Sequence, residues 1–164
     1  MNTGEKLIRY TEGDATEPSG PGEKIIVHIC NDIGKWGKGF VLAVSRRWKE
    51  PEQEFRAAYA RKPRLALGEV QFVRVSETVT VANVIGQRDI VPDAKGVPPV
   101  HYEAIRTGLE EVAAHALEIG ASVHMPRIGC GLAGGSWDKI GPIVEEMLAN
   151  RGVDVTVYDI GLRK

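Results

Sequence analysis

The chain has 164 residues, with 21 lysines and arginines against 22 aspartates and glutamates, and a formal net charge of -1. Its composition, 43% hydrophobic and 26% charged, excludes a disordered chain, and the balanced charge disfavours a strongly basic nucleic-acid binder. No apolar run approaches the roughly 20 residues that span a bilayer, and residues 1–6 lack the apolar core of a signal peptide. We therefore expect one cytoplasmic domain over residues 1–164, without a membrane partner.

Extended and helical patterns alternate along the chain. Extended patterns predict strands over residues 6–10, 24–30, 69–75, 78–85, 122–125 and 153–160, and those over 69–75 and 78–85 are rich in valine and threonine and indicate a hairpin. Apolar residues at helical spacing predict helices over residues 40–48, 52–60, 102–119 and 136–148. The run over 24–30 (KIIVHIC) is apolar at nearly every position, which is typical of a parallel strand buried on both faces. The alternation favours an α/β sandwich with a mostly parallel sheet.

Local signals predict several element boundaries. Pro51 is expected to end the first helix, and Gly120 fits just past the end of the helix over 102–119. Ser136 can cap the last helix, but a proline in a helix interior costs roughly 3 kcal/mol. Because Pro142 lies deep in this pattern, we expect a lead-in turn from Ser136 and a regular helix that begins near Gly141.

Four loops are rich in glycine or proline, the first over residues 16–23. The loop over residues 89–99 carries no motif, whereas residues 31–39 (NDIGKWGKG) and 127–135 (RIGCGLAGG) each follow a predicted strand and lead into a helix. Ligands of open α/β sheets bind beyond the carboxyl ends of the strands, and glycine lets successive N–H groups point at one anion. Two such loops that face each other would suit a diphosphate. For either loop alone, glycines that only form turns remain the alternative.

Known phosphate-loop, dinucleotide-binding and metal-binding patterns are not found. Neither glycine loop is followed by the Gly-Lys-Ser/Thr run of a P-loop or has the G-x-G-x-x-G fingerprint. Cys30 and Cys130 form no C-x-x-C pair and are expected to be small buried residues. The histidines show no metal-ligand spacing, so we expect neither a metal nor a cofactor, and we expect His28 and His124 to be hydrogen-bonded core residues.

The second glycine loop carries the resemblance to a known family. Residues 125–132 (MPRIGCGL), with Trp137 after them, resemble the phosphate loop of macrodomains. Residues 10–14 (YTEGD), 26–39 and 156–158 (TVY) resemble the opening strand, the first binding loop and the last strand of that family. The similarity is to the branch of the terminal ADP-ribose protein glycohydrolase and a chromatin-remodeller macrodomain. It implies a three-layer αβα fold with a mixed, mostly parallel central sheet, and a cleft that binds ADP-ribose.

The resemblance also implies roles for individual residues. Asp14 would accept a hydrogen bond from the adenine amine, Ile160 would pack against the adenine ring, and Asn31 would contact the distal ribose. The two loops would hold the diphosphate. Their expected ligand-binding residues are Gly34, Trp36, Gly37, Lys38, Gly39 and Phe40 in the first loop, and Arg127, Gly129, Cys130, Gly131, Leu132, Ala133 and Gly134 in the second. For Trp137 we prefer a packing role.

The sequence departs from the family at the two groups that perform covalent hydrolysis in this branch. Gln87 stands at the position of the attacking lysine, and Ala133 stands at the position of the acid–base aspartate. A glutamine amide is not a nucleophile, and alanine cannot exchange protons. We therefore expect a water positioned between the diphosphate and the distal ribose of the substrate, with Asn31, Asp32 and Gln87 as candidate catalytic residues.

Three functions follow, in order of preference. The first is a hydrolase that releases ADP-ribose from an acceptor, either a glutamate or aspartate ester on a protein or a nucleobase. The second is a non-catalytic reader of ADP-ribose, which the two substitutions favour. The third is an ADP-ribose 1″-phosphate phosphatase, which residues 31–39 also resemble. The expected partners are ADP-ribose and ADP-ribosylated protein, with nucleic acid as the alternative acceptor, and the oligomeric state stays open.

Overall fold

The computed structural model describes residues 6–61 and 65–160, in which six strands form one sheet in the order β1-β6-β5-β2-β4-β3. The strands are β1 (Ile8–Glu12), β2 (Lys24–Asn31), β3 (Val70–Arg74), β4 (Val79–Gln87), β5 (Ser122–Met125) and β6 (Val155–Asp159). The pairing of β3 with β4 is antiparallel, as the predicted hairpin requires, and the other neighbouring strands are parallel. The predicted mixed, mostly parallel sheet is therefore confirmed.

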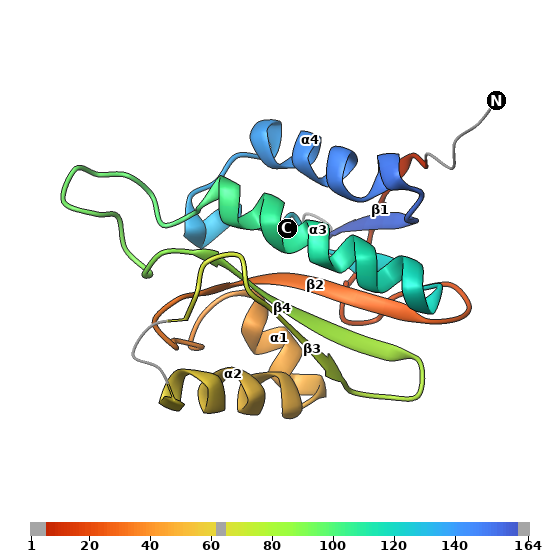
Figure 1. Ribbon diagram of the computed structural model, residues 1–164, viewed down its shortest axis with the longest axis horizontal. Helices are drawn as coiled ribbons and strands as arrows, with labels where there is room; N and C mark the ends of the chain where they lie inside the picture. Colours follow the sequence, from red (N-terminus) through yellow and green to blue (C-terminus); the bar gives the residue numbers. More distant parts are fainter. Residues whose placement is uncertain (1–5, 62–64, 161–164) are drawn as a thin grey trace.

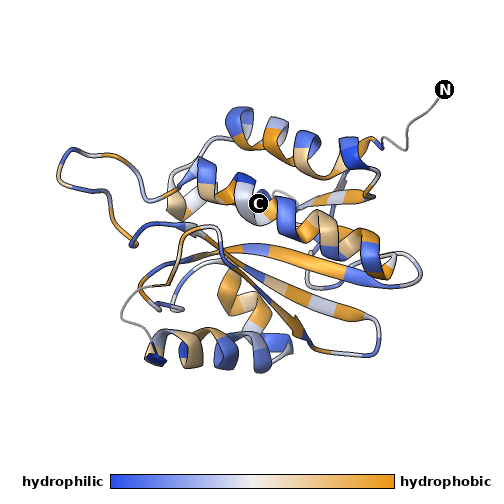
Figure 2. Ribbon diagram, in the orientation of Figure 1, coloured by the Kyte–Doolittle hydropathy of each residue, from blue (hydrophilic) through white to orange (hydrophobic). Residues whose placement is uncertain are grey.

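Helices cover both faces of the sheet (Figure 1). The helices α1 (Phe40–Arg47) and α2 (Glu50–Arg61) lie on one face, and α3 (Tyr102–Ile119) and α4 (Trp137–Met147) lie on the other. Each face has its own hydrophobic core, and each helix contributes its apolar side to one of them (Figure 2). The expected three-layer αβα architecture is confirmed. No helix among the described residues is long and apolar enough to cross a membrane.

The strand β2 contributes to both cores. Seven of its eight residues are buried, and it pairs with β4 on one side and with β5 on the other. Ile25 and Val27 face the core under α3 and α4, whereas Ile26 and Cys30 face the core under α1 and α2. The continuous apolar run over 24–30 is thus explained by burial on alternating sides.

Two prolines act differently from the prediction, one in α4 and one in α2. The helix α4 is continuous from Trp137, so the expected lead-in turn before Gly141 is wrong. Ser136 does cap it, since its Oγ accepts from the Asp138 N–H at 3.1 Å. Pro142 leaves the Asp138 carbonyl without its helical partner, but both residues are exposed and water can satisfy that carbonyl.

The second proline lies in α2 rather than after α1. The helix α1 ends at Arg47, where Trp48 is extended, with φ -142° and ψ 139°. The helix α2 then begins at Glu50, so Pro51 occupies its first turn. A missing N–H is harmless there because the first helical N–H groups have no partner within the helix.

A hydrogen-bonded group of polar side chains lies inside the sheet. The Asn83 Nδ2 of β4 donates to the Pro51 carbonyl at 3.0 Å and to the Gln71 Oε1 at 3.1 Å, and its Oδ1 lies 2.6 Å from the His28 Nε2. Because the Asn83 oxygen can only accept, His28 donates from Nε2 and its Nδ1 carries no proton. Burial accordingly lowers the pKa of His28 to about 4.

His124 of β5 ties the sheet to the loop before β2. Its Nδ1 lies 2.7 Å from the Tyr158 hydroxyl, which accepts from the Ser19 N–H at 3.0 Å, and its Nε2 lies 2.8 Å from the Ser122 Oγ. Burial, followed by the nearby cations Lys24 and Arg9, lowers the pKa of His124 to about 4. The expected satisfied core histidine is confirmed for His124, whereas His28 keeps an unpaired Nδ1 among the described residues.

Replacement of Asn83 by alanine should destabilise the protein. It would leave the buried His28 Nε2–H without its Asn83 acceptor and the Gln71 Oε1 without its Asn83 donor, so we expect the free energy of unfolding to fall by about 2 kcal/mol or more. Urea unfolding measures this. The matched control is Asn150→Ala, because Asn150 is exposed and we expect a change below about 0.5 kcal/mol. Equal effects of the two substitutions would contradict the role given to Asn83.

Stability should also fall as the pH is lowered from about 6.5 towards 4. The pKa values of His28 and His124 are near 4 in the folded protein against 6.5 for an unperturbed histidine. The unfolded chain therefore binds more protons than the folded protein in this window. The contribution of the two neutral imidazoles to the free energy of unfolding is fully present above pH 6.5. It falls as the pH is lowered, with a slope of about 2 kcal/mol per pH unit near pH 5. Urea unfolding at several pH values tests this. A free energy of unfolding that stays flat between pH 6.5 and 5 would contradict it.

Candidate ligand-binding cleft

The carboxyl ends of β2, β4 and β5 meet at one edge of the sheet. Residues 32–39, here loop 1, follow β2, and residues 126–135, here loop 2, follow β5. The loops approach each other closely, since a Cβ on Gly39 would lie 3.5 Å from the Leu132 Cδ1. Two adjoining pockets open between them and share Lys38, Gln87 and Leu132 in their walls. The predicted glycine loops thus do face each other.

The larger pocket, here the loop-1 pocket, has a volume of about 520 Å³ and is lined by three cations and no carboxylate. The Lys35 and Lys38 side chains form no ion pair or hydrogen bond with any described residue, whereas Arg56 is paired with Glu52 at 2.8 Å. Its apolar wall includes Ile90 and Val91. The pocket therefore offers positive charge beside an apolar surface, which suits an organic anion.

The N-terminus of α1 opens onto the same cleft. Gly39, its N-cap residue, has φ 86° and supplies no side-chain cap. Within the described part of the chain, the N–H groups of Gly37, Lys38 and Gly39 donate to no protein acceptor. Unpaired N–H groups and the positive end of a helix dipole together form an anion site.

Asn31 lines the loop-1 pocket but uses its amide to hold loop 1. Its Oδ1 accepts from the Ile33 N–H at 3.1 Å and the Lys35 N–H at 3.0 Å, and its Nδ2 donates to the Lys35 carbonyl at 2.8 Å. These bonds close the turn that brings Lys35 to the pocket. The register shift after Cys30 places Asn31 beside Gln87.

The other two candidate catalytic residues occupy different positions. Asp32 is 1% exposed, and its Oδ1 accepts from the Asp89 N–H at 2.8 Å, so it holds the segment after β4 and does not line either pocket. Gln87 lines both pockets. Its Nε2 donates to the Asp89 carbonyl at 3.0 Å, and its Oε1 has no partner among the described residues. Gln87 therefore presents an acceptor to the cleft.

The smaller pocket, here the loop-2 pocket, has a volume of about 330 Å³ and lies against loop 2 and the start of α1. The predicted binding residues that line it are Lys38, Gly39, Phe40, Arg127, Gly129, Cys130, Gly131, Leu132 and Ala133. Gly129 has φ 74°, and a Cβ there would lie 2.7 Å from the Ile140 side chain, so only glycine fits. Partial burial raises the pKa of the Cys130 thiol although Arg127 opposes this, which keeps the thiol neutral.

Two predicted binding glycines serve packing. A Cβ on Gly34 would lie 2.5 Å from the Tyr59 ring, and one on Gly134 would lie 2.8 Å from Pro98. Neither residue lines the two pockets. Trp36 does line the loop-1 pocket, but it is 4% exposed and its Nε1 donates to the Ser45 Oγ at 2.7 Å.

The predicted adenine-binding residues lie at the ends of β1 and β6, outside both pockets. Ile160 directly follows β6 and is 75% exposed. The Asp14 Oδ1 accepts from the Thr16 N–H at 2.8 Å and from the Thr16 Oγ1 at 2.7 Å. Burial raises the pKa of Asp14, but these hydrogen bonds, with Arg47 and Arg46, outweigh it and lower the pKa overall. Asp14 is thus an ionised acceptor.

Sequence analysis missed the contacts that hold loop 2. The Arg127 guanidinium donates to Asp159 at 2.7 and 3.0 Å and lies 5.2 Å from the Tyr10 ring centre and 5.3 Å from that of Trp137. The hydrogen bonds from Arg127 lower the pKa of Asp159. Tyr10 and Trp137 are far apart in sequence and carry no shared local signal, so this cluster was not predictable, although the packing role expected for Trp137 is confirmed.

The segment over residues 88–101 was also missed. The sequence pattern indicates only a proline- and glycine-rich loop over residues 89–99, yet Ile90 and Val91 line the loop-1 pocket. Its length was the available signal, since long connections without a helix or strand are uncommon in compact domains and are often functional. Among the described residues, no group of three or more His, Cys, Asp or Glu side chains could hold a metal ion.

Curated proteins resemble this chain over different lengths. The chromodomain-helicase-DNA-binding protein 1-like of Danio rerio is 32% identical over 161 residues, which cover 92% of this chain and 15% of that protein. The ADP-ribose glycohydrolase OARD1 of Bos taurus is 38% identical over 60 residues, which cover 36% of this chain and 40% of that protein. The chain therefore spans 15% of the first relative and 40% of the second.

Solved structures match over nearly the whole chain, although no protein-family model matches it. A protein of unknown function from Bacteroides thetaiotaomicron is 54% identical with a TM-score of 0.93, covering 94% of this chain and 99% of that one. A macrodomain protein from Streptomyces coelicolor is 52% identical with a TM-score of 0.81, covering 94% of this chain and 100% of that one. With such identity over the full length of a macrodomain, and with the predicted fold confirmed, this chain belongs to the macrodomain family.

Proposed function

We propose that the cleft binds ADP-ribose and that the protein hydrolyses the bond between ADP-ribose and an acceptor, in the simplest case a glutamate or aspartate ester on a protein. The observation that carries this proposal is the uncapped N-terminus of α1 in a cleft whose two lysines have no partner among the described residues. A diphosphate has the charge that such a site stabilises. Similarity to a glycohydrolase named for ADP-ribose supports this ligand.

Each part of ADP-ribose has a complementary feature along the edge of the sheet. In this proposal the diphosphate lies between the loops, where the Gly37 and Gly39 N–H groups are unpaired among the described residues. The adenine lies towards Asp14 and Ile160 at the ends of β1 and β6, because an ionised carboxylate accepts from the amine and an apolar side chain packs on the ring. The distal ribose then occupies the loop-1 pocket beside Gln87.

A positioned water would perform the chemistry. Its oxygen forms a bond to C1″ of the distal ribose while the bond from C1″ to the acceptor oxygen breaks, and the acceptor leaves as a carboxylate. The Gln87 Oε1 accepts a hydrogen bond from this water. As the water attacks, it gives a proton to a diphosphate oxygen of the substrate, and that proton then passes to solvent. Asn31 and Asp32 act as positioning residues, because their side chains hold loop 1 and the segment over 88–101.

Binding without turnover is the second candidate function. One observation favours it: no carboxylate lines either pocket, because Asp32 is directed to the Asp89 N–H. A general base other than the substrate would therefore be lacking. The carboxylate released from such an ester is a good leaving group, so its departure needs little catalytic assistance. For this reason we place hydrolysis first.

Replacement of Gly37 by leucine should block the ligand. A Cβ at Gly37 meets no atom within 4 Å and the residue lines the loop-1 pocket, so the side chain should enter the pocket without strain. We expect the Kd for ADP-ribose, measured by calorimetry, to rise about tenfold or more while the melting temperature stays within about 2 °C. The control is Ala114→Leu on the exposed side of α3, which should leave both values unchanged. Unchanged ADP-ribose affinity in Gly37→Leu would reject the cleft as the site.

Hydrolysis is tested with protein that carries mono-ADP-ribose on carboxylates. We expect the wild-type protein to release ADP-ribose, and Gln87→Ala to lower kcat about tenfold to a hundredfold with little change in KM, because the water loses one positioning partner. Chromatographic quantification of free ADP-ribose measures the rate. Tight ADP-ribose binding without release by the wild type would reject the hydrolase and leave the reader.

A further inference from the structure

We propose that the segment over residues 88–101 docks the polypeptide that carries ADP-ribose, and that its hollow receives an apolar side chain next to the modified residue. This inference rests on the proposed function, which places the acceptor just beyond the distal ribose in the loop-1 pocket. In Figure 1 the segment projects from the left side of the molecule, between β4 and α3.

The base of the segment is firmly attached. Its backbone hydrogen bonds run from the Arg88 N–H to the Pro99 carbonyl, from the Val100 N–H to the Ala133 carbonyl, and from the His101 N–H to the Gly86 carbonyl, at 2.8–2.9 Å. The buried Asp32 carboxylate adds the bond from the Asp89 N–H. The base is therefore tied to loop 1 through Asp32, to β4 through Gly86 and to loop 2 through Ala133, so its position depends on the same elements that form the cleft.

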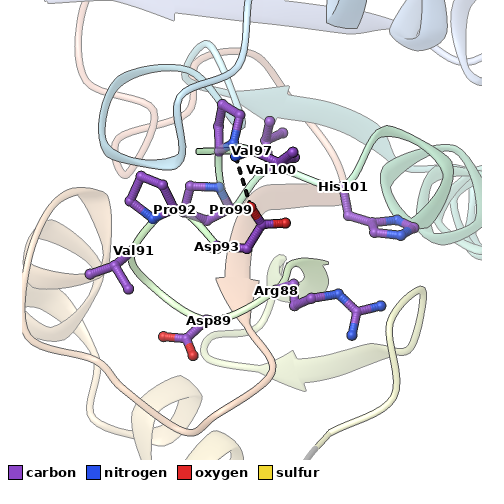
Figure 3. A pocket seen from close by; sticks show the side chains of 10 residues that line it. Arg88, Asp89, Val91, Pro92, Asp93, Val97, Pro99, Val100 and His101 are labelled. Carbon is purple, nitrogen blue, oxygen red and sulfur yellow. Dashed lines mark hydrogen bonds between the residues drawn. The ribbon is translucent and has the colours of Figure 1, made fainter. Parts of the chain in front are cut away.

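The tip of the segment is closed on itself. The Asp93 Oδ1 accepts from the Val97 N–H at 2.9 Å (Figure 3). It also accepts from the Lys95 N–H at 2.8 Å, and the Asp93 N–H donates to the Val97 carbonyl at 3.0 Å. Pro92 and Pro98 restrict the backbone on either side of this turn. A surface ordered in advance loses little conformational entropy when a partner binds.

This ordered segment exposes apolar side chains around a hollow of about 460 Å³, here the segment pocket. Val91 and Val97 are 58% and 53% exposed. The lining residues are Arg88, Asp89, Val91, Pro92, Asp93, Val97, Pro98, Pro99, Val100 and His101 (Figure 3). Val91 also lines the loop-1 pocket, so the two pockets meet at this side chain. An acceptor joined to the distal ribose would leave the loop-1 pocket across Val91.

The chemistry of the segment pocket favours polypeptide over nucleic acid. Valine and proline make up six of its ten lining residues, and they contact aliphatic side chains well. Its lining carries Arg88 against Asp89 and Asp93, so it offers no excess of positive charge to phosphates, and it includes no Phe, Tyr or Trp on which a base could stack. The partner is therefore a protein segment with an apolar residue beside its ADP-ribosylated glutamate or aspartate.

The test uses two synthetic peptides that carry ADP-ribose through a non-hydrolysable linkage and differ in having leucine or serine on both sides of the modified residue. Calorimetry gives the Kd of each peptide and of free ADP-ribose. We expect the wild-type protein to bind the leucine peptide about tenfold more tightly than the serine peptide, as partial burial of a leucine predicts.

Val97→Ser should reduce this preference below about threefold and leave the Kd of free ADP-ribose unchanged, because Val97 lies outside the loop-1 and loop-2 pockets. Leu117→Ser, at a site on α3 that is 54% exposed against 53% for Val97, is the matched control and should keep the full preference.

The outcomes separate this inference from the proposed function. If the wild type binds free ADP-ribose but binds both peptides equally, or if Val97→Ser keeps the leucine preference, the docking role is overturned while the cleft stands. If an ADP-ribosylated oligonucleotide binds more tightly than either peptide and Val97→Ser weakens it, the partner is nucleic acid and the proposal is wrong. If free ADP-ribose itself does not bind, the proposed function and the docking role are both overturned.

Discussion

Parallel pairing of β2 with both β4 and β5 is the constraint on which the rest of the structure depends. It brings three carboxyl ends to one edge of the sheet, so that two loops far apart in sequence face each other. Burial of β2 on both faces stabilises this arrangement. Polar side chains can remain inside it because His28 and Asn83 hydrogen-bond to each other, which offsets much of their desolvation.

The cleft is built mainly from backbone that side chains hold in place. Asn31 closes loop 1, Asp32 attaches the segment over 88–101, and Arg127 holds loop 2 against β6 through Asp159. The groups left to meet a ligand are N–H groups, lysines and one glutamine oxygen. Such a site is suited to recognise charge and shape, and under the proposed function a positioned water and the substrate's own phosphates would make and break the bonds.

Element boundaries could be predicted where a residue at the boundary itself ends the helix or strand. The helix over 102–119 and the strand over 122–125 have the predicted bounds, because Gly120 in a left-handed conformation ends the helix between them. The prediction failed at Pro142. The cost of a proline inside a helix includes a carbonyl that loses its hydrogen bond, and at this exposed position water can bond to that carbonyl instead. It also shifted β1 by two residues, since an edge strand takes its bounds from its pairing with β6.

The sequence by itself determined the fold class and the two glycine loops, because periodicity, glycine placement and strand ends are local properties, whereas the candidate positions Asn31 and Gln87 came from the family resemblance. Only the tertiary structure decided which polar atoms remain unpaired. Asp32 and Gln87 look equally suited to catalysis in sequence, yet the Asp89 backbone, 57 positions from Asp32, engages the carboxylate and leaves the Gln87 oxygen facing the cleft. Contacts over such separations depend on how strands pair, which no local pattern specifies.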